Sequence, residues 1–141
     1  MSELRLPMPA IELLPHRPPM LLIDELLECQ PTSGRVTARF DANSLFADRG
    51  GQIEPVVMVE LLAQAWAAVK GWQDRSQGLP VRQGYLVGGR SVTVYQAPRI
   101  GESLSIVVEL AGEIDGFAVI DGQIVCGKNT LAEGSLKLWI P

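Results

Sequence analysis

Cysteine and histidine are scarce in this chain. Its 141 residues contain two cysteines, Cys29 and Cys126, and one histidine, His16. Two cysteines make no disulfide framework, and a single histidine gives no metal-ligand spacing. The composition therefore argues against a disulfide-stapled scaffold and a zinc centre, and we expect neither a metal nor another cofactor.

Basic runs and long apolar runs are missing too. The net charge is −4, and no stretch combines basic with aromatic residues, so nucleic acid is not an expected partner. The most apolar stretch, residues 54–72, is shorter and more polar than the about 20 apolar residues of a membrane span. The first residues, M-S-E-L-R-L-P-M-P, have no apolar signal segment. We expect a cytoplasmic protein that is not in a membrane.

The remaining composition is that of a globular protein. Hydrophobic residues make up 47% of the chain and charged residues 20%. The length suits one domain with one core, and no linker divides the chain. We therefore predict a single domain over residues 1–141.

Residues 54–72, E-P-V-V-M-V-E-L-L-A-Q-A-W-A-A-V-K-G-W, predict a long helix. Pro55 suits the first helical turn, where its missing N–H would have no partner, and Gly71 is a plausible end. Apolar residues occupy every face, which predicts a helix buried all round. Glu60 and Gln64 interrupt this pattern and, being four apart, share one face. A buried carboxylate is costly unless it is paired or used, so Glu60 is either a structural partner of the sheet or a functional group.

Strand patterns surround this helix. Short apolar or alternating runs bounded by turn residues predict six strands, at residues 20–28, 35–40, 85–96, 103–110, 117–126 and 130–140. Residues 31–34 and Asp115-Gly116 are hairpin signals, and Gly88-Gly89 indicates a bulge. Ala10 to Leu14 predicts a short helical turn within a proline-rich segment. An apolar helix needs a curved sheet around it. The predicted class is α+β, with one long buried central helix wrapped by a curved antiparallel sheet of about five to six strands.

Three segments, in order, resemble the hotdog-fold 3-hydroxyacyl-acyl-carrier-protein dehydratases of bacterial fatty-acid synthesis. They are Leu14-Pro-His-Arg17 with Met20-Leu-Leu-Ile-Asp24, then Pro55 to Gln64, and then Pro98-Arg-Ile-Gly101-Glu102. Ala63-Gln64, Gly71-Trp72 and Gly84 to Arg90 are most similar to an offshoot of that family found in aryl-polyene and related polyketide-type pathways. The resemblance implies a hotdog fold and a dehydratase that acts on an acyl chain carried by acyl carrier protein.

One family motif is missing. The family has Gly-His-Phe-Pro on the loop before the helix, and that histidine removes the proton next to the thioester carbonyl. Here the loop reads Phe46-Ala-Asp-Arg-Gly-Gly-Gln52, which is shorter and has no histidine. The family's Pro-Gly at the helix start, whose backbone N–H helps to hold the thioester carbonyl, is Pro55-Val56. Free N–H groups at the helix start would still favour an oxyanion there, which makes Val56 and Val57 candidate substrate-binding residues.

The resemblance places Glu60 at the position of the catalytic acid. A dehydratase also needs a base. His16 is one candidate, although it aligns with a family histidine that is not catalytic and is more typical of a structural or interface residue. Asp48, in the changed loop, is a second candidate, with a solvated loop residue as its alternative. Gln64 is expected as a hydrogen-bond partner beside the substrate, and Trp66 as core or as lining of the acyl tunnel.

In the resembled family the active site lies between two subunits, one giving the histidine and the other the glutamate. Three functions remain open on the sequence. In the first, the chain is a dehydratase that acts on an acyl chain carried by acyl carrier protein and works as a homodimer or as a heterodimer with a related hotdog chain. In the second, it is a non-catalytic partner of a histidine-bearing hotdog chain. In the third, it is a hotdog acyl thioesterase in which Glu60 activates water. Contact with an acidic carrier protein would need a basic patch, for which Arg17, Lys70, Arg82, Arg90 and Arg99 are candidates.

Overall fold

The computed structural model describes residues 4–141, except for the side chains of residues 88–90. A two-residue strand β1 (Met8–Pro9) and a 3₁₀ turn (Ala10–Glu12) precede the hairpin of β2 (Glu25–Gln30) and β3 (Ser33–Ala38). The helix α1 (Val57–Ser76) follows. The chain ends with four long strands: β4 (Tyr85–Val94), β5 (Leu104–Ile114), β6 (Phe117–Cys126) and β7 (Asn129–Trp139).

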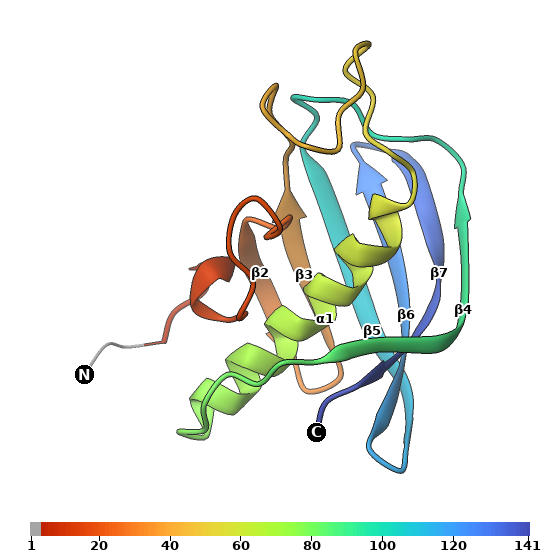
Figure 1. Ribbon diagram of the computed structural model, residues 1–141. Helices are drawn as coiled ribbons and strands as arrows, with labels where there is room; N and C mark the ends of the chain where they lie inside the picture. The colour runs from red at the N-terminus through yellow and green to blue at the C-terminus, as the bar shows by residue number, and fades with distance from the viewer. Residues whose placement is uncertain (1–3) are drawn as a thin grey trace.

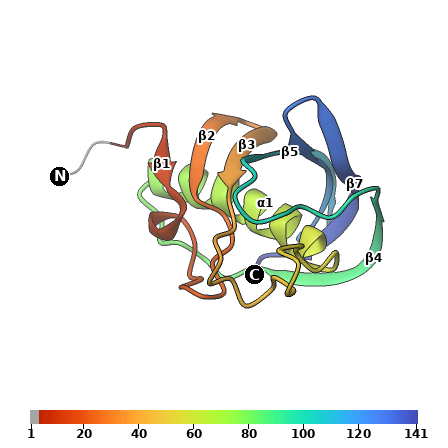
Figure 2. The ribbon, with the colours of Figure 1, turned by 90° about the horizontal axis from the view of Figure 1, so that it is seen from above.

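The strands form one antiparallel sheet in the order β1-β2-β3-β5-β6-β7-β4. Its long neighbours β5 and β6 are joined at Asp115-Gly116, where both residues have positive φ (51° and 83°), as a tight primed turn requires. The sheet runs behind α1 in Figure 1 and curls around it when seen from above in Figure 2, with β1 and β2 on one side and β4 on the other. This is the predicted hotdog fold. Among residues 4–141, no helix is long and apolar enough to cross a membrane.

The core lies between α1 and the concave face of the sheet. Leu104, Ile106 and Val108 of β5 alternate inward as predicted, and each is at most 2% exposed. The helix supplies the facing side chains, which are Met58, Leu61, Leu62, Ala65, Ala68 and Val69. Gly122 of β6 leaves room for Leu62, because a Cβ there would lie 2.5 Å from the leucine side chain.

The predicted helix was shifted by several residues. It begins at Val57, two residues after Pro55, and continues past Gly71 to Ser76. Gly71 does not end the helix but lies against the backbone of Leu13, so close that a Cβ would be 2.9 Å from the Leu13 carbonyl carbon and closer still to its oxygen. Glycine at this position therefore serves close packing rather than termination.

The prediction that α1 is buried on every face was wrong for one stripe. Glu60, Ala63, Ala67 and Lys70 are spaced by three or four residues and are only partly buried. The partial burial of these four side chains shows that neither the sheet nor the N-terminal segment fully covers this side of the helix. We call these four residues the open stripe of α1.

Two strand predictions also changed. The segment 20–28 becomes a strand only from Glu25, because the backbone of Met20 and Leu22 is hydrogen-bonded to the Gln64 side chain of the helix instead of to a strand. Met8–Pro9 adds a short seventh strand to the six predicted. The bulge expected at Gly88-Gly89 falls within the register shift between Val87 and Ser91, and the side chains there are outside the described part of the chain.

An ion pair between a buried aspartate and an exposed arginine connects the end of α1 to the segment that leads into β4. Arg82 donates from Nε and Nη2 to the two carboxylate oxygens of Asp74, both at 3.1 Å, and the Asp74 side chain is 6% exposed. We expect Asp74→Asn to lower the free energy of unfolding by about 2 kcal/mol, because it leaves a guanidinium without its charge partner; the partial exposure of Arg82 keeps the loss below that of a fully buried pair.

Urea unfolding would measure this loss. The matched control is Glu28→Gln, which breaks the exposed pair with Arg35 at 2.8 Å and should cost less than about 1 kcal/mol. Equal effects of the two substitutions would contradict a stabilising role for the Asp74–Arg82 pair.

Candidate functional site

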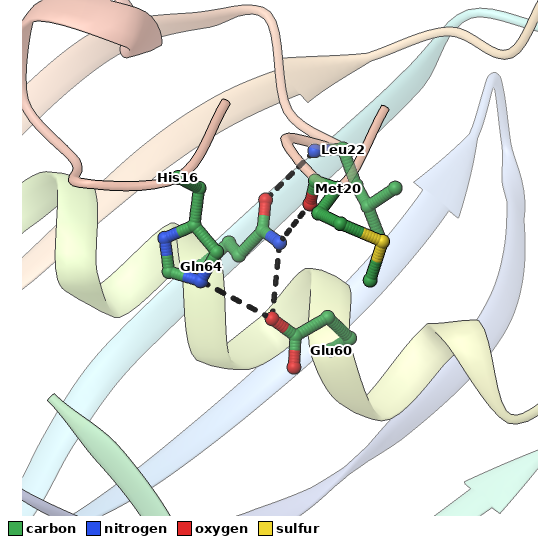
Figure 3. Close-up of polar contacts among 5 residues, drawn as sticks. All are labelled: His16, Met20, Leu22, Glu60 and Gln64. Carbon is green, nitrogen blue, oxygen red and sulfur yellow. Dashed lines mark hydrogen bonds and ion pairs between the residues drawn. The ribbon is translucent and has the colours of Figure 1, made fainter. Parts of the chain in front are cut away.

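Glu60 lies near the start of α1, on the open stripe. Its side chain is 39% exposed. The carboxylate oxygen Oε1 accepts a hydrogen bond from Nε2 of Gln64 at 3.0 Å, one helical turn further on, and lies 3.6 Å from Nε2 of His16 (Figure 3). The carboxylate is thus held from two sides while part of it faces open space. This arrangement suits a group that meets a substrate.

Gln64 organises this site. It is 1% exposed, and its Oε1 accepts the Leu22 backbone N–H at 2.8 Å. Its Nε2 donates to the Met20 carbonyl at 2.8 Å as well as to Glu60, so both amide hydrogens are used (Figure 3). Gln64 therefore fixes the Glu60 carboxylate and, at the same time, ties the segment after His16 to the helix.

His16 reaches Glu60 from the N-terminal segment. Arg17 supports this segment by donating from Nη1 to the carbonyls of Leu14 (2.9 Å) and His16 (2.7 Å). The His16 side chain is 29% exposed, and its Nδ1 is buried without a hydrogen-bond partner among residues 4–141. The sequence favoured a structural or interface histidine; the fold brings it beside the candidate acid.

A small pocket of about 60 Å³ opens beside this pair. Apart from His16, Glu60 and Gln64 its lining is apolar or small, and consists of Pro15, Ala63, Trp66, Ala67, Gly84, Leu86, Leu138 and Ile140. Trp66 is 1% exposed. Two of the residues predicted to meet a substrate, Gln64 and Trp66, therefore line the same pocket as Glu60.

Asp48 does not join this pocket. Its Oδ1 accepts hydrogen bonds from the backbone N–H groups of Gly50 and Gln52, both at 2.9 Å. This pattern organises a tight loop through the aspartate side chain. The carboxylate that the sequence offered as a substitute base is thus occupied with its own loop.

The start of the helix differs from the expected oxyanion site. Val57 is buried, and its N–H donates to the Glu54 carbonyl at 3.0 Å; the N–H of Met58 donates to the Pro55 carbonyl at the same distance. The expectation of free N–H groups was therefore wrong at Val57, because a turn before the helix already uses them. Val56 is the helix N-cap and is 74% exposed.

A depression of about 310 Å³ beside the loop after β3 was not recognised as a site from the sequence. Asp24, Arg39, Phe40 and Asp41 are among its lining residues. Desolvation raises the pKa of the Asp24 carboxyl, a hydrogen bond from the Arg39 backbone opposes this, and the nearby charge of Glu25 adds to the rise. The sequence signal for this depression was that Asp24 is the last residue of a segment that resembles the dehydratase family.

The structure describes four of the five candidate basic side chains. Lys70 and Arg82 line one pocket. Arg17 bonds its own segment, and Arg99 donates to the Gly50 carbonyl. The side chain of Arg90 lies outside the described residues.

A family model described as ApeP-like, ApeP dehydratase, matches residues 8–141. The 3-hydroxyacyl-[acyl-carrier-protein] dehydratase FabZ of Syntrophomonas wolfei is 31% identical over 132 residues, which are 86% of this chain and 90% of the relative. FabZ of Oenococcus oeni is 32% identical over 133 residues, 85% of this chain and 92% of the relative.

Two solved structures show the range of likeness. A chain of the dehydratase heterocomplex ApeI:P from Xenorhabdus doucetiae superposes with a TM-score of 0.88 at 25% identity, covering 95% of this chain and 91% of that chain. A hypothetical thioesterase with coenzyme A from Streptococcus pneumoniae has a TM-score of 0.64 at 15% identity, covering 83% and 84%. The second shares the fold alone.

Proposed function

Because the chain belongs to the ApeP-like dehydratase family, we propose that it is a subunit of a 3-hydroxyacyl-[acyl-carrier-protein] dehydratase of fatty-acid or aryl-polyene-type biosynthesis. The substrate is a 3-hydroxyacyl thioester on acyl carrier protein, and the setting is the cytoplasm. The subunit works in a dimer whose active site lies at the interface, with Glu60 as the acid.

The observation that supports this proposal most strongly is the orientation and position of the Glu60 carboxyl. Its carboxyl is oriented by Gln64 and His16 and faces a pocket with mostly apolar walls. In the reaction a base takes the proton from the carbon next to the thioester carbonyl. Glu60 gives a proton to the departing hydroxyl, which leaves as water, and the double bond forms between the carbon that lost the proton and the carbon that lost the hydroxyl. The Val56 backbone N–H at the helix start is the proposed donor to the thioester carbonyl.

We assign the base to a partner subunit. The loop 46–52 has no histidine, and Asp48 is engaged with its own loop. Nε2 of His16 faces Glu60 itself, which suits a residue that orients the carboxyl more than one that removes a proton from carbon. The similarity to a chain of the ApeI:P heterocomplex favours a histidine-bearing hotdog chain as that partner.

A dehydration assay tests this assignment. The purified chain, alone and mixed with a related histidine-bearing hotdog chain, is given a 3-hydroxyacyl carrier protein, and loss of water is followed by mass spectrometry. We expect turnover with the mixture and little with this chain alone. Full turnover by this chain alone would move the base to His16. Release of the free carrier thiol without loss of water would instead support the thioesterase function.

A further inference from the structure

The two oxygens of the Glu60 carboxyl lie in different surroundings. Oε1 accepts the hydrogen bond from Gln64 Nε2 at 3.0 Å and lies 3.6 Å from His16 Nε2. Among residues 4–141, Oε2 takes part in no hydrogen bond or ion pair, and both dashed lines that reach the carboxyl in Figure 3 end on the same oxygen. Oε2 is therefore the oxygen that remains for a ligand in the pocket that Glu60 lines.

The surroundings of the His16 ring restrict which of its nitrogens carries hydrogen. Nδ1 is buried and has no hydrogen-bond partner in the described part of the chain. An imidazolium carries an N–H at both nitrogens, so it would bury a charged donor without an acceptor at Nδ1. A neutral ring with its hydrogen on Nδ1 would bury an unpaired N–H as well. The neutral form with hydrogen on Nε2 avoids both, and it directs a donor toward Oε1 of Glu60.

The form of this ring decides where the proton of the pair resides. If His16 were an imidazolium paired with the Glu60 carboxylate, Glu60 would have no proton to give. With a neutral ring the proton stays on the glutamate. Because Oε1 accepts from Gln64 and faces the Nε2 hydrogen of His16, the place for this proton is Oε2. The isolation of Nδ1 thus favours the form of the pair that an acid requires.

We propose that His16 is a positioning residue of the dehydration. As a neutral Nε2–H donor it holds Oε1 of Glu60 together with Gln64, so that Oε2 carries the proton that the departing hydroxyl receives. This inference rests on the proposed function, in which Glu60 is the acid. It assigns His16 a role that differs from that of a base, because the ring neither takes nor gives a proton.

In this reaction the O–H bond at Oε2 breaks, and its proton joins the hydroxyl oxygen, which leaves as water with the electron pair of its C–O bond. The electron pair of the O–H bond stays on Glu60, and the partner subunit's base holds the proton from carbon. Negative charge therefore develops on Glu60, and the N–H groups of Gln64 and His16 stabilise it. The 3.6 Å between His16 and Oε1 is long for a hydrogen bond and should shorten when substrate is bound.

Nuclear magnetic resonance tests the form of the ring directly, because His16 is the single histidine of the chain. The chain, isotopically labelled only in its histidine nitrogens, is assembled with an unlabelled histidine-bearing partner at a pH at which the complex is active. We expect one ring nitrogen with hydrogen and one without, and couplings to the ring carbon-bound protons should identify the first as Nε2. Hydrogen on both nitrogens, or on Nδ1 alone, would overturn the proposal.

Two substitutions test the effect of His16 on the rate of the assembled complex. His16→Gln keeps a neutral N–H donor near the position of Nε2 and should retain kcat within about threefold. His16→Leu removes the donor and should lower kcat about tenfold with little change in KM, as expected for one lost hydrogen bond. In the Glu60→Gln background the leucine substitution should have no further effect, since His16 acts through Glu60. Ile11→Ala is the control, because Ile11 is exposed on the same segment and does not line the pocket.

Equal losses of kcat in the glutamine and leucine variants would overturn the role as a neutral donor, and so would a wild-type rate of His16→Leu. The resonance measurement needs no substitution and therefore decides the question even where a variant does not fold. The two levels of inference fail separately. Full activity of Glu60→Gln rejects Glu60 as the acid, whereas an inactive Glu60→Gln beside a fully active His16→Leu rejects only the role of His16.

Discussion

Glu60→Gln is expected to lower the dehydration rate of the assembled enzyme by about 10²- to 10⁴-fold, the usual contribution of a general acid. Glutamine has the same shape, and its side-chain oxygen still accepts the Gln64 Nε2 hydrogen bond that now reaches Oε1 at 3.0 Å. What it lacks is a proton to give to the departing hydroxyl. The rate is measured on the complex with the histidine-bearing partner, and assembly is measured by size-exclusion chromatography.

Glu54→Gln is the control for this experiment. Glu54 is exposed just before the helix and is not among the residues that line the pocket at Glu60. It should retain the wild-type rate. An assembled Glu60→Gln variant with full activity would exclude Glu60 as the acid, and loss of assembly would assign it a structural role.

Gly71→Ala is expected to destabilise the protein by about 3 kcal/mol, at the upper end of the cost of overpacking. The new methyl group would collide with the Leu13 backbone, which cannot turn away as a side chain does. Leu13 is fully buried, so either the helix or the N-terminal segment must shift. Because that segment also carries His16, we expect the contact with Glu60 to loosen together with the fold.

Urea unfolding gives the loss of stability, and Gly112→Ala is the matched control. A Cβ at Gly112, in β5, would have no other atom within 4 Å, so this substitution should change stability by less than about 1 kcal/mol. A Gly71→Ala variant as stable as the control would show that the helix and the N-terminal segment can separate without cost.

Residue patterns alone predict most of the helices and strands. The alternation of Leu104, Ile106 and Val108 needs only the two-residue period of a strand, and Asp115-Gly116 needs only the preference of tight hairpins for positive φ. The boundaries were less accurate. The prediction that Gly71 ends the helix was wrong because glycine has the same local signature whether it ends a helix or admits a neighbouring backbone.

The sequence also predicted only part of the candidate site. The four-residue spacing of Glu60 and Gln64 in an apolar helix predicted that they share one face, and the resemblance placed Glu60 at the position of the family's catalytic acid. The uncovered stripe was not predictable, because the apolar pattern of a helix does not show how far a sheet will curl around it. The sequence offered Asp48 as a base, but it does not show that the carboxylate accepts hydrogen bonds from the backbone of its own loop.

The sequence by itself determined the periodic elements, the hairpins and the polar pair on the central helix, since each depends on residues within a few positions of one another. Only the tertiary structure decided that His16 meets Glu60 and that Trp66 lines the pocket beside them. Both depend on contacts between distant segments: the Gln64 amide bonded to the Met20 and Leu22 backbone, Leu13 packed on Gly71, and Ile140 beside Trp66. Such contacts follow from how the helix, the sheet and the N-terminal segment pack in three dimensions, and no local pattern encodes them.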